Sequence, residues 1–167
     1  MRNHHSKKIA FLGVCTSVAL VLAYVESLIP PLYAAVPGIK LGLPNVAIIF
    51  VLYRYGVKEA AAVSLVRMAA VALLFGNPMT FAYSLAGGFL SLTAMALLRK
   101  INSFSIVGVS VAGGVSHNVG QILTAMLLLN TAQLGYYLVV LTVTGTVAGI
   151  LIGLCGSLLI KRIPKKF

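Results

Sequence analysis

The chain has 167 residues, of which 60% are hydrophobic and only 9% are charged. A soluble domain carries about 25% charged residues, so this chain cannot give a soluble particle a polar surface, and we expect an integral membrane protein. The formal net charge of +11 does not indicate nucleic-acid binding, because the cations stand in short clusters between apolar runs, as in cytoplasmic loops and headgroup contacts.

Six apolar runs follow one another along the chain, and about 20 apolar residues suffice to cross a bilayer as a helix. Pro30 and Pro31 end the first run, since proline lacks a donor and disfavours helix at the residue before it. Pro44 suits the first turn of the second run. We therefore expect an all-α, single transmembrane domain over residues 1–167, with spans at residues 9–29, 43–55, 59–75, 79–98, 106–129 and 134–160.

Two alternatives to this topology remain open at the level of the sequence. The first run could belong to a cleaved signal peptide, but residues 9–29 are long enough to span, and Ala34-Ala35 is only a weak cleavage site. The second and third runs are short, and they could form one re-entrant hairpin instead of two spans.

The distribution of cations predicts the orientation of the chain. The loop at residues 30–42 and the other two external turns would hold only Lys40, and Arg67 lies within a span. If the N-terminus is cytoplasmic, the inner segments hold 11 of the 13 Lys and Arg residues, namely Arg2, Lys7, Lys8, Arg54, Lys58, Arg99, Lys100, Lys161, Arg162, Lys165 and Lys166. This asymmetry predicts cytoplasmic N- and C-termini in a multi-pass protein of a bacterial plasma membrane.

Small residues recur at four-residue intervals on three of the predicted helices. Lipid offers no hydrophobic reason for helices to associate, so close backbone contact at small faces stabilises their packing. Gly145, Gly149 and Gly153 form such a pattern on the sixth helix, and Gly108, Ala112, Ser116 and Gly120 form one on the fifth; both favour packing within the chain. The first helix carries the pairs Gly13/Ser17 and Ala19/Ala23, which could also dock another membrane protein.

Arg67 is the most informative single residue, because it lies near the middle of the third predicted span. A charge there costs at least about 2.5–3.5 kcal/mol, and such residues usually face a cavity or a partner. The functional interpretation of Arg67 is a ligand contact, and the structural interpretation is an ion pair or a snorkelling side chain. Glu26, near the outer end of the first helix, is a candidate partner for Arg67, although it could equally face water.

The fifth predicted helix carries a polar group in its apolar run. His117 and Gln121 are four residues apart and share a helix face, with Asn118 beside them. A single intramembrane histidine often makes only a helix-to-helix hydrogen bond, but this group favours a cavity. Further polar residues stand at outer helix ends, where each alone could be a cap or an interfacial residue; these are Lys40, Asn45, Asn77, Thr80 and Tyr83. Together with Arg67 they predict an outward-facing, positive pocket for a carboxylate or phosphate ligand.

Several kinds of catalytic and metal site are missing from the sequence. Two acidic residues cannot build the paired aspartate-rich Mg²⁺ sites of a prenyl diphosphate synthase. The chain has no P-loop, no GxSxG motif and no Cys/His cluster with metal-ligand spacing. We therefore expect a protein that is not an enzyme on its own and that uses no cofactor and no metal.

The stretches PGIKLGLPN, YRYG, GNPMTFAYSLAGG and GGVSHNVGQ resemble the Gx transporter family. This family is also catalogued as heptaprenyl diphosphate synthase component I membrane proteins, and it is similar to the S components of energy-coupling factor (ECF) transporters. The resemblance implies a six-helix bundle that binds a vitamin or cofactor precursor from outside, beneath the loop between helices one and two. It also implies docking on a transmembrane coupling protein with two ATPase subunits, typically through an AxxxA pattern on the first helix, which Ala19 and Ala23 match.

Three functional hypotheses follow from these observations. The leading one is a substrate-binding subunit of an ATP-driven importer for a small, anionic vitamin, cofactor or isoprenoid or quinone precursor. The second is a non-catalytic membrane accessory subunit of heptaprenyl diphosphate synthesis. A stand-alone secondary transporter is third, because the sequence shows no evident inverted repeat and no acidic proton relay.

Overall fold

The computed structural model describes residues 2–28, 42–101 and 103–163, and this part of the chain is helical throughout apart from short turns. The prediction of an all-α fold is therefore confirmed for these residues. The helices are α1 (Arg2–Leu28), α2 (Asn45–Arg54), α3 (Val57–Leu74), α4 (Pro78–Arg99), α5 (Ile106–Leu129), the short 3₁₀ helix η1 (Ala132–Tyr136) and α6 (Tyr137–Arg162).

Local sequence explains most of the helix boundaries. Asn77 caps α4 reciprocally with Thr80: its side chain accepts from the Thr80 N–H at 2.8 Å, and the Thr80 hydroxyl accepts from the Asn77 N–H at 3.0 Å. The Ser105 side chain caps α5 by accepting from Gly108. Gly56 separates α2 from α3 with a φ of 121°, a conformation that suits glycine.

Four helices are long and apolar enough to cross a membrane, which identifies the chain as a membrane protein. They comprise residues His5–Leu28, Pro78–Arg99, Ile106–Leu129 and Ala132–Arg162. The helix α3 is not among them: it has 18 residues but carries Lys58, Glu59 and Arg67.

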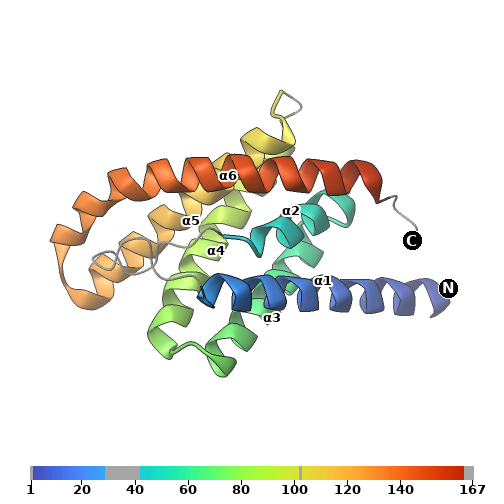
Figure 1. Ribbon diagram of the computed structural model, residues 1–167, viewed down its shortest axis with the longest axis horizontal. Coiled ribbons are helices and arrows are strands. Elements are labelled where there is room, and N and C mark those ends of the chain that lie inside the picture. The colour runs from blue at the N-terminus through green and yellow to red at the C-terminus, as the bar shows by residue number, and fades with distance from the viewer. Residues whose placement is uncertain (1, 29–41, 102, 164–167) are drawn as a thin grey trace.

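The apolar run predicted as a span at residues 43–55 forms a helix that is too short to cross a bilayer by itself, so a crossing there stays a prediction. The ten residues of α2 make a helix of about 15 Å, half of the roughly 30 Å hydrocarbon core. Every side chain from Ala47 to Leu52 is buried. In the ribbon, α2 lies between α1 and α6 (Figure 1), and it contacts both. The second apolar run is therefore a core helix rather than a lipid-facing one.

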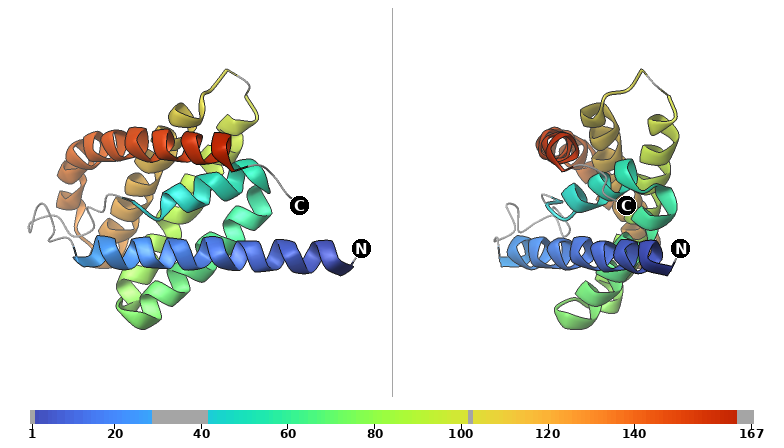
Figure 2. Two further views of the ribbon diagram at one scale, coloured as in Figure 1. Left: turned by 45° about the vertical axis from the view of Figure 1, so that its right-hand side comes forward. Right: turned by 90° about the vertical axis from the view of Figure 1, so that its right-hand side faces the viewer.

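The six α-helices pack in two connected groups. The most extensive contacts join α5 to α4 and to α6, whereas α1 packs on α3 and α2. The first residues of α1 and the last residues of α6 lie at the same end of the molecule (Figures 1 and 2). This arrangement agrees with termini on one side of a membrane, and which side they face stays a prediction.

Three cations predicted for the cytoplasmic side make specific contacts at this end. Arg54 donates to the carbonyl oxygens of Ile160 and Ile163 at the end of α6. Arg99 donates to the Leu52 carbonyl oxygen at the end of α2 at 2.5 Å. Because the C-terminal end of a helix is the negative end of its dipole, these guanidinium groups stabilise both helix ends. The third, Lys8, forms an ion pair with Glu59 at 2.5 Å, which joins α1 to α3.

Candidate functional site

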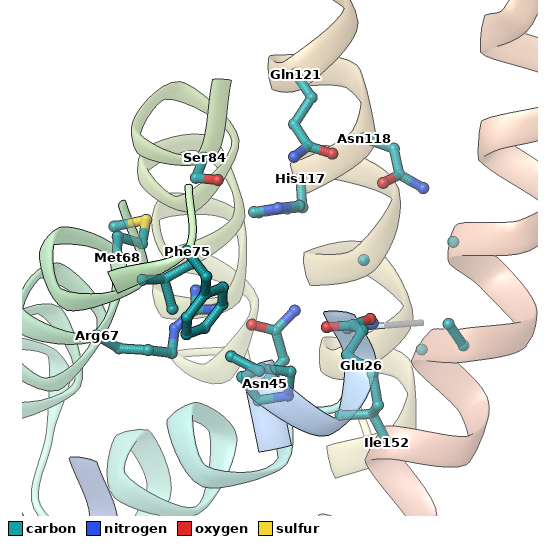
Figure 3. Close-up of a pocket in the computed structure, with 18 residues that line it drawn as sticks. Glu26, Asn45, Arg67, Met68, Phe75, Ser84, His117, Asn118, Gln121 and Ile152 are labelled. Atoms are coloured by element: carbon teal, nitrogen blue, oxygen red, sulfur yellow. The ribbon is translucent and has the colours of Figure 1, made fainter. Parts of the chain in front are cut away.

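A cavity of about 60 Å³ lies between the helices, and each of the six α-helices or its immediate flank contributes to the lining. Figure 3 shows the labelled side chains around it. The polar side chains of the lining are Glu26, Asn45, Arg67, Ser84, His117, Asn118 and Gln121. Six of the ten residues that the sequence analysis groups into a pocket therefore line one cavity, although they come from α1, α2, α3 and α5.

Arg67 supplies the positive charge of the cavity. It extends from α3 into the lining (Figure 3), and its Nε atom is buried without a hydrogen-bond partner in the described part of the chain. The carboxylate of Glu26 interacts with it electrostatically. This supports the predicted pairing of the two residues. A buried guanidinium with an unused donor is nevertheless costly. A hydrogen-bond acceptor placed beside the Arg67 Nε atom would therefore stabilise the site.

Glu26 also fixes the chain where it enters α2. Glu26 is only 9% exposed, and one of its carboxylate oxygens accepts a hydrogen bond from the Gly42 N–H. Gly42 has a φ of 74°, and a Cβ added there would lie 3.2 Å from the Asn45 side chain and 3.4 Å from that of Ile152. Glu26 therefore has a structural role in addition to lining the cavity.

Lys40 and most of the loop predicted at residues 30–42 lie outside the described residues.

The N-terminal end of α2 is part of the cavity wall through Pro44 and Asn45. Its first N–H groups are already used: Asn45 donates to Gly42 at 2.8 Å, Val46 to Leu43 at 3.2 Å and Ala47 to Pro44 at 3.1 Å. The helix therefore offers no spare N–H donors at its first residues, but it still places the positive end of its dipole at the cavity. This adds to the positive character that Arg67 creates.

The polar residues of α5 divide between two neighbours. Asn118 points toward α6 (Figure 3) and donates to the Leu141 carbonyl oxygen at 2.6 Å. His117 points the other way (Figure 3), and a Cβ added at Gly87 of α4 would lie 2.9 Å from Gln121 and 3.1 Å from the His117 ring. His117 and Gln121 therefore share the α4 side, as their spacing predicts, whereas Asn118 connects α5 to α6.

Two predicted site residues lie elsewhere, and others were missed. Asn77 is exposed and serves as the cap of α4, and Tyr83 is not part of the cavity lining. Its neighbour Ser84 is, together with Phe75. A serine and a phenylalanine in apolar helices carry no distinguishing signal in the sequence, so only the packing of α3 against α4 identifies them.

The predicted docking residues of α1 face opposite ways. Ala19 is fully buried and Ala23 is 8% exposed and lines the cavity, so neither is available to a partner in this structure. The AxxxA pair instead lets α1 pack closely within the chain. Gly13 and Ser17 lie in a shallow, mostly apolar groove on the outer face of α1, and a Cβ added at Gly13 would meet nothing within 4 Å.

The described lining can recognise a ligand by charge and hydrogen bonding. It offers a guanidinium, a carboxylate, an imidazole, three amides and a hydroxyl. Among the residues that the structure describes, no three His, Cys, Asp or Glu side chains come together as a possible metal site.

Comparison with known proteins gives one informative result. Neither the curated proteins nor the solved structures include a significant match to the chain. The family model described as heptaprenyl diphosphate synthase component I, in contrast, matches residues 15–159, which include all of the polar residues that line the cavity. The chain therefore belongs to the heptaprenyl diphosphate synthase component I family.

Proposed function

We propose that this protein is the substrate-binding membrane subunit of a multi-component importer and that its ligand occupies the cavity around Arg67. The observation that carries this proposal is the buried Nε of Arg67, which has no hydrogen-bond partner among the described residues. A charged residue inside a membrane protein costs at least about 2.5–3.5 kcal/mol. A bound acceptor offsets that cost. Arg54 also has a buried Nε without a partner, but its guanidinium donates to the carbonyl oxygens of Ile160 and Ile163 at the end of α6.

The ligand is an anion in this proposal. Arg67 and the positive end of the α2 dipole both favour negative charge. The one carboxylate of the described lining, Glu26, already accepts from Gly42. His117 and Gln121 lie on the same wall and add hydrogen-bonding groups. A small vitamin, cofactor precursor, or isoprenoid or quinone precursor with a carboxylate or phosphate fits this chemistry.

Transport requires partners in this scheme, because the chain contains no P-loop. By its similarity to ECF S components, the chain would work with a transmembrane coupling protein and two ATPase subunits. Gly13 and Ser17 remain accessible on α1 and are the better candidates for that contact. We place the protein in the cell membrane with cytoplasmic termini and six crossings, of which the second, at residues 43–55, is short. It acts by binding rather than by catalysis.

The alternative is a non-catalytic accessory subunit of heptaprenyl diphosphate synthesis, and the description of the matching family favours it. The two roles differ in their partners. Co-purification with a soluble prenyl diphosphate synthase, and shortened prenyl chains on deletion of the gene, would support the accessory role. Loss of uptake of a small molecule with normal prenyl chains would rule it out.

The direct test is ligand binding by the purified protein and by Arg67→Ala. We expect one member of a panel of flavins, thiamin-like compounds, quinone precursors and prenyl phosphates to bind. Removing a charge-assisted hydrogen bond, worth about 1.5–3 kcal/mol, should weaken that binding at least tenfold without loss of folding. Isothermal titration calorimetry in lipid nanodiscs measures the affinity.

Lys100→Ala is the matched control, because it removes an exposed cation outside the cavity. Its affinity should equal that of the wild type. Unchanged affinity in Arg67→Ala, or misfolding of that variant, would return Arg67 to a structural role. Failure of the whole panel together with failure to co-purify with a coupling protein would contradict the importer function.

A further inference from the structure

A second cavity of about 100 Å³ adjoins the one around Arg67. The two share four lining residues, namely Met68, Val71, Phe75 and Ser84. Both therefore meet at the surface where α3 packs against α4. The shared residues form a common wall, so the two cavities are neighbouring compartments separated by side chains.

The compartments differ in chemistry. The first holds the charges of Arg67 and Glu26 together with the amides. The second has no charged residue in its described lining, and its own contributions are Ser27, Ala72, Gly76, Thr80 and Phe81. Its two additional hydroxyls are already used, because Ser27 donates to the Tyr24 carbonyl and Thr80 donates to the Asn77 carbonyl. The second compartment is therefore suited to an apolar group.

Ser84 stands where the compartments meet, because it lines both of them. Phe75 lies at the same junction. Its ring makes an edge-to-face contact with the ring of Tyr24, and the two ring centroids are 5.9 Å apart. A ligand that crosses the junction would meet a hydroxyl on one side and an aromatic ring on the other.

We infer that the ligand is an amphipathic anion, with its carboxylate or phosphate at Arg67 and a compact apolar body in the compartment between α3 and α4. This inference rests on the proposed binding function and narrows its substrate class. Size supports it: the first compartment alone is far smaller than the roughly 300 Å³ or more of a usual ligand pocket. Each compartment is smaller than the apolar cavity of about 150 Å³ that can bind benzene, so a small ring or short branched chain with one acidic group would extend through both.

Matched probes test the inference on the wild-type protein in lipid nanodiscs. Phenyl phosphate is compared with inorganic phosphate, and benzoate is compared with acetate and with the neutral benzamide. Empty nanodiscs correct for partition of the aromatic probes into lipid. We expect the aromatic anions to bind at least tenfold more tightly than the small anions, because burial of a ring contributes about 25 cal/mol per Å² of apolar surface. Benzamide should bind more weakly than benzoate.

Substitutions on α3 locate the apolar body. Ala72 lines only the second compartment, and Ala72→Leu fills part of it. This variant should lose the advantage of phenyl phosphate over inorganic phosphate while it keeps the affinity for inorganic phosphate. Ala62→Leu is the matched control, because Ala62 is exposed on the same helix, and it should bind all probes as the wild type does.

Equal affinity for the aromatic and the small anions would overturn the inference while leaving the anion-binding function intact. Retention of the aromatic advantage in Ala72→Leu would also overturn the placement of the apolar body. Binding of none of the anions to the wild-type protein would instead overturn the binding function on which the inference rests. The wild-type comparison does not depend on whether any variant folds.

Discussion

The α5–α6 interface and the α1–α3 side of the molecule differ in how much space they leave between helices. At α5–α6, a Cβ added to Gly149 would lie 2.6 Å from the Val111 Cα, and one added to Gly114 would lie 2.6 Å from the Gly145 carbonyl oxygen. Backbones touch there, and nothing larger than hydrogen fits. Beside α1 and α3 the chain instead leaves two cavities, the first of which extends to the α5–α6 interface, because Gly114, Gly145 and Gly149 are part of its lining.

The comparison separates the part of the bundle that holds its shape from the part that can accept a ligand. Helices in lipid gain no hydrophobic stabilisation when they pack on one another, so close backbone contact stabilises their packing through dispersion. A cavity forgoes those contacts, and a buried arginine without a full set of partners adds a further cost. The rigid glycine interface, which forms one wall of the first cavity through Gly114, Gly145 and Gly149, can support this cost. Four substitutions test the contrast, from the largest expected effect to the smallest.

Gly149→Leu should break the glycine interface. Overpacking a core costs about 1–3 kcal/mol when side chains can adjust, but here the nearest atoms are backbone atoms of Val111 and Ser110. We therefore expect a loss of more than about 3 kcal/mol, seen as loss of folded protein or a much lower unfolding midpoint in detergent. Gly13→Leu is the control on the open face of α1 and should stay within about 0.5 kcal/mol of the wild type. Similar losses for both variants would contradict the contrast.

Glu26→Gln should alter the cavity side. The amide keeps an oxygen that can accept from Gly42, but it removes the negative charge that interacts with Arg67. Without ligand, we expect stability to fall by about 1–3 kcal/mol, since a hydrogen bond to a charged group is worth about that much. Anion affinity should rise about tenfold, because the ligand no longer competes with the carboxylate.

Titration of phenyl phosphate against Glu26→Gln and the wild-type protein measures this change, and thermal unfolding without ligand measures the cost. Weaker anion binding in the variant would show that Glu26 supports the bound anion rather than opposing it.

Asn118→Ala and Gln121→Ala test the helix that borders both regions. Asn118 is buried and donates to Leu141 at 2.6 Å, so its loss should cost about 1 kcal/mol of stability, within the 0.6–2 kcal/mol range for such bonds in membranes. Gln121 lines the cavity without such a bond to α6, so its variant should lower anion affinity a few-fold with a smaller effect on stability. Parallel unfolding and titration of the two variants would reveal the difference, and the reverse order of stabilities would be inconsistent with this division of roles.

The sequence predicted the polar core of the candidate site for a simple energetic reason. Arg67, His117 and Gln121 are costly inside apolar helices, so their presence alone indicated a cavity, and the four-residue spacing correctly placed His117 and Gln121 on one face. The same reasoning grouped Asn118 with them, but one residue further along a helix is rotated by about 100°, and that rotation turns it toward α6.

Small-residue patterns were less specific. The glycines of α6 pack as predicted, but the predicted row on α5 does not act as a unit: Gly108 has only Ser105 and Phe104 near its added Cβ, whereas Gly120 packs on Gly87 of α4. The AxxxA pair on α1 was predicted to dock a partner, but Ala19 and Ala23 are buried within the chain. A spacing of four residues marks a face that permits close approach, but it carries no information on which neighbour approaches.

By itself, the sequence determined the membrane class, the positions of the long helices and the presence of buried polar residues, because each depends on local composition and spacing. Only the tertiary structure decided that α2 is a short core helix, that Glu26 accepts a hydrogen bond from Gly42 at the entry to α2, and that Ser84 and Phe75 line two neighbouring cavities. These features depend on the distances between helices far apart in the chain. Such distances are set by which side chains are small enough to let two backbones approach, and that is a property of pairs of helices rather than of one segment.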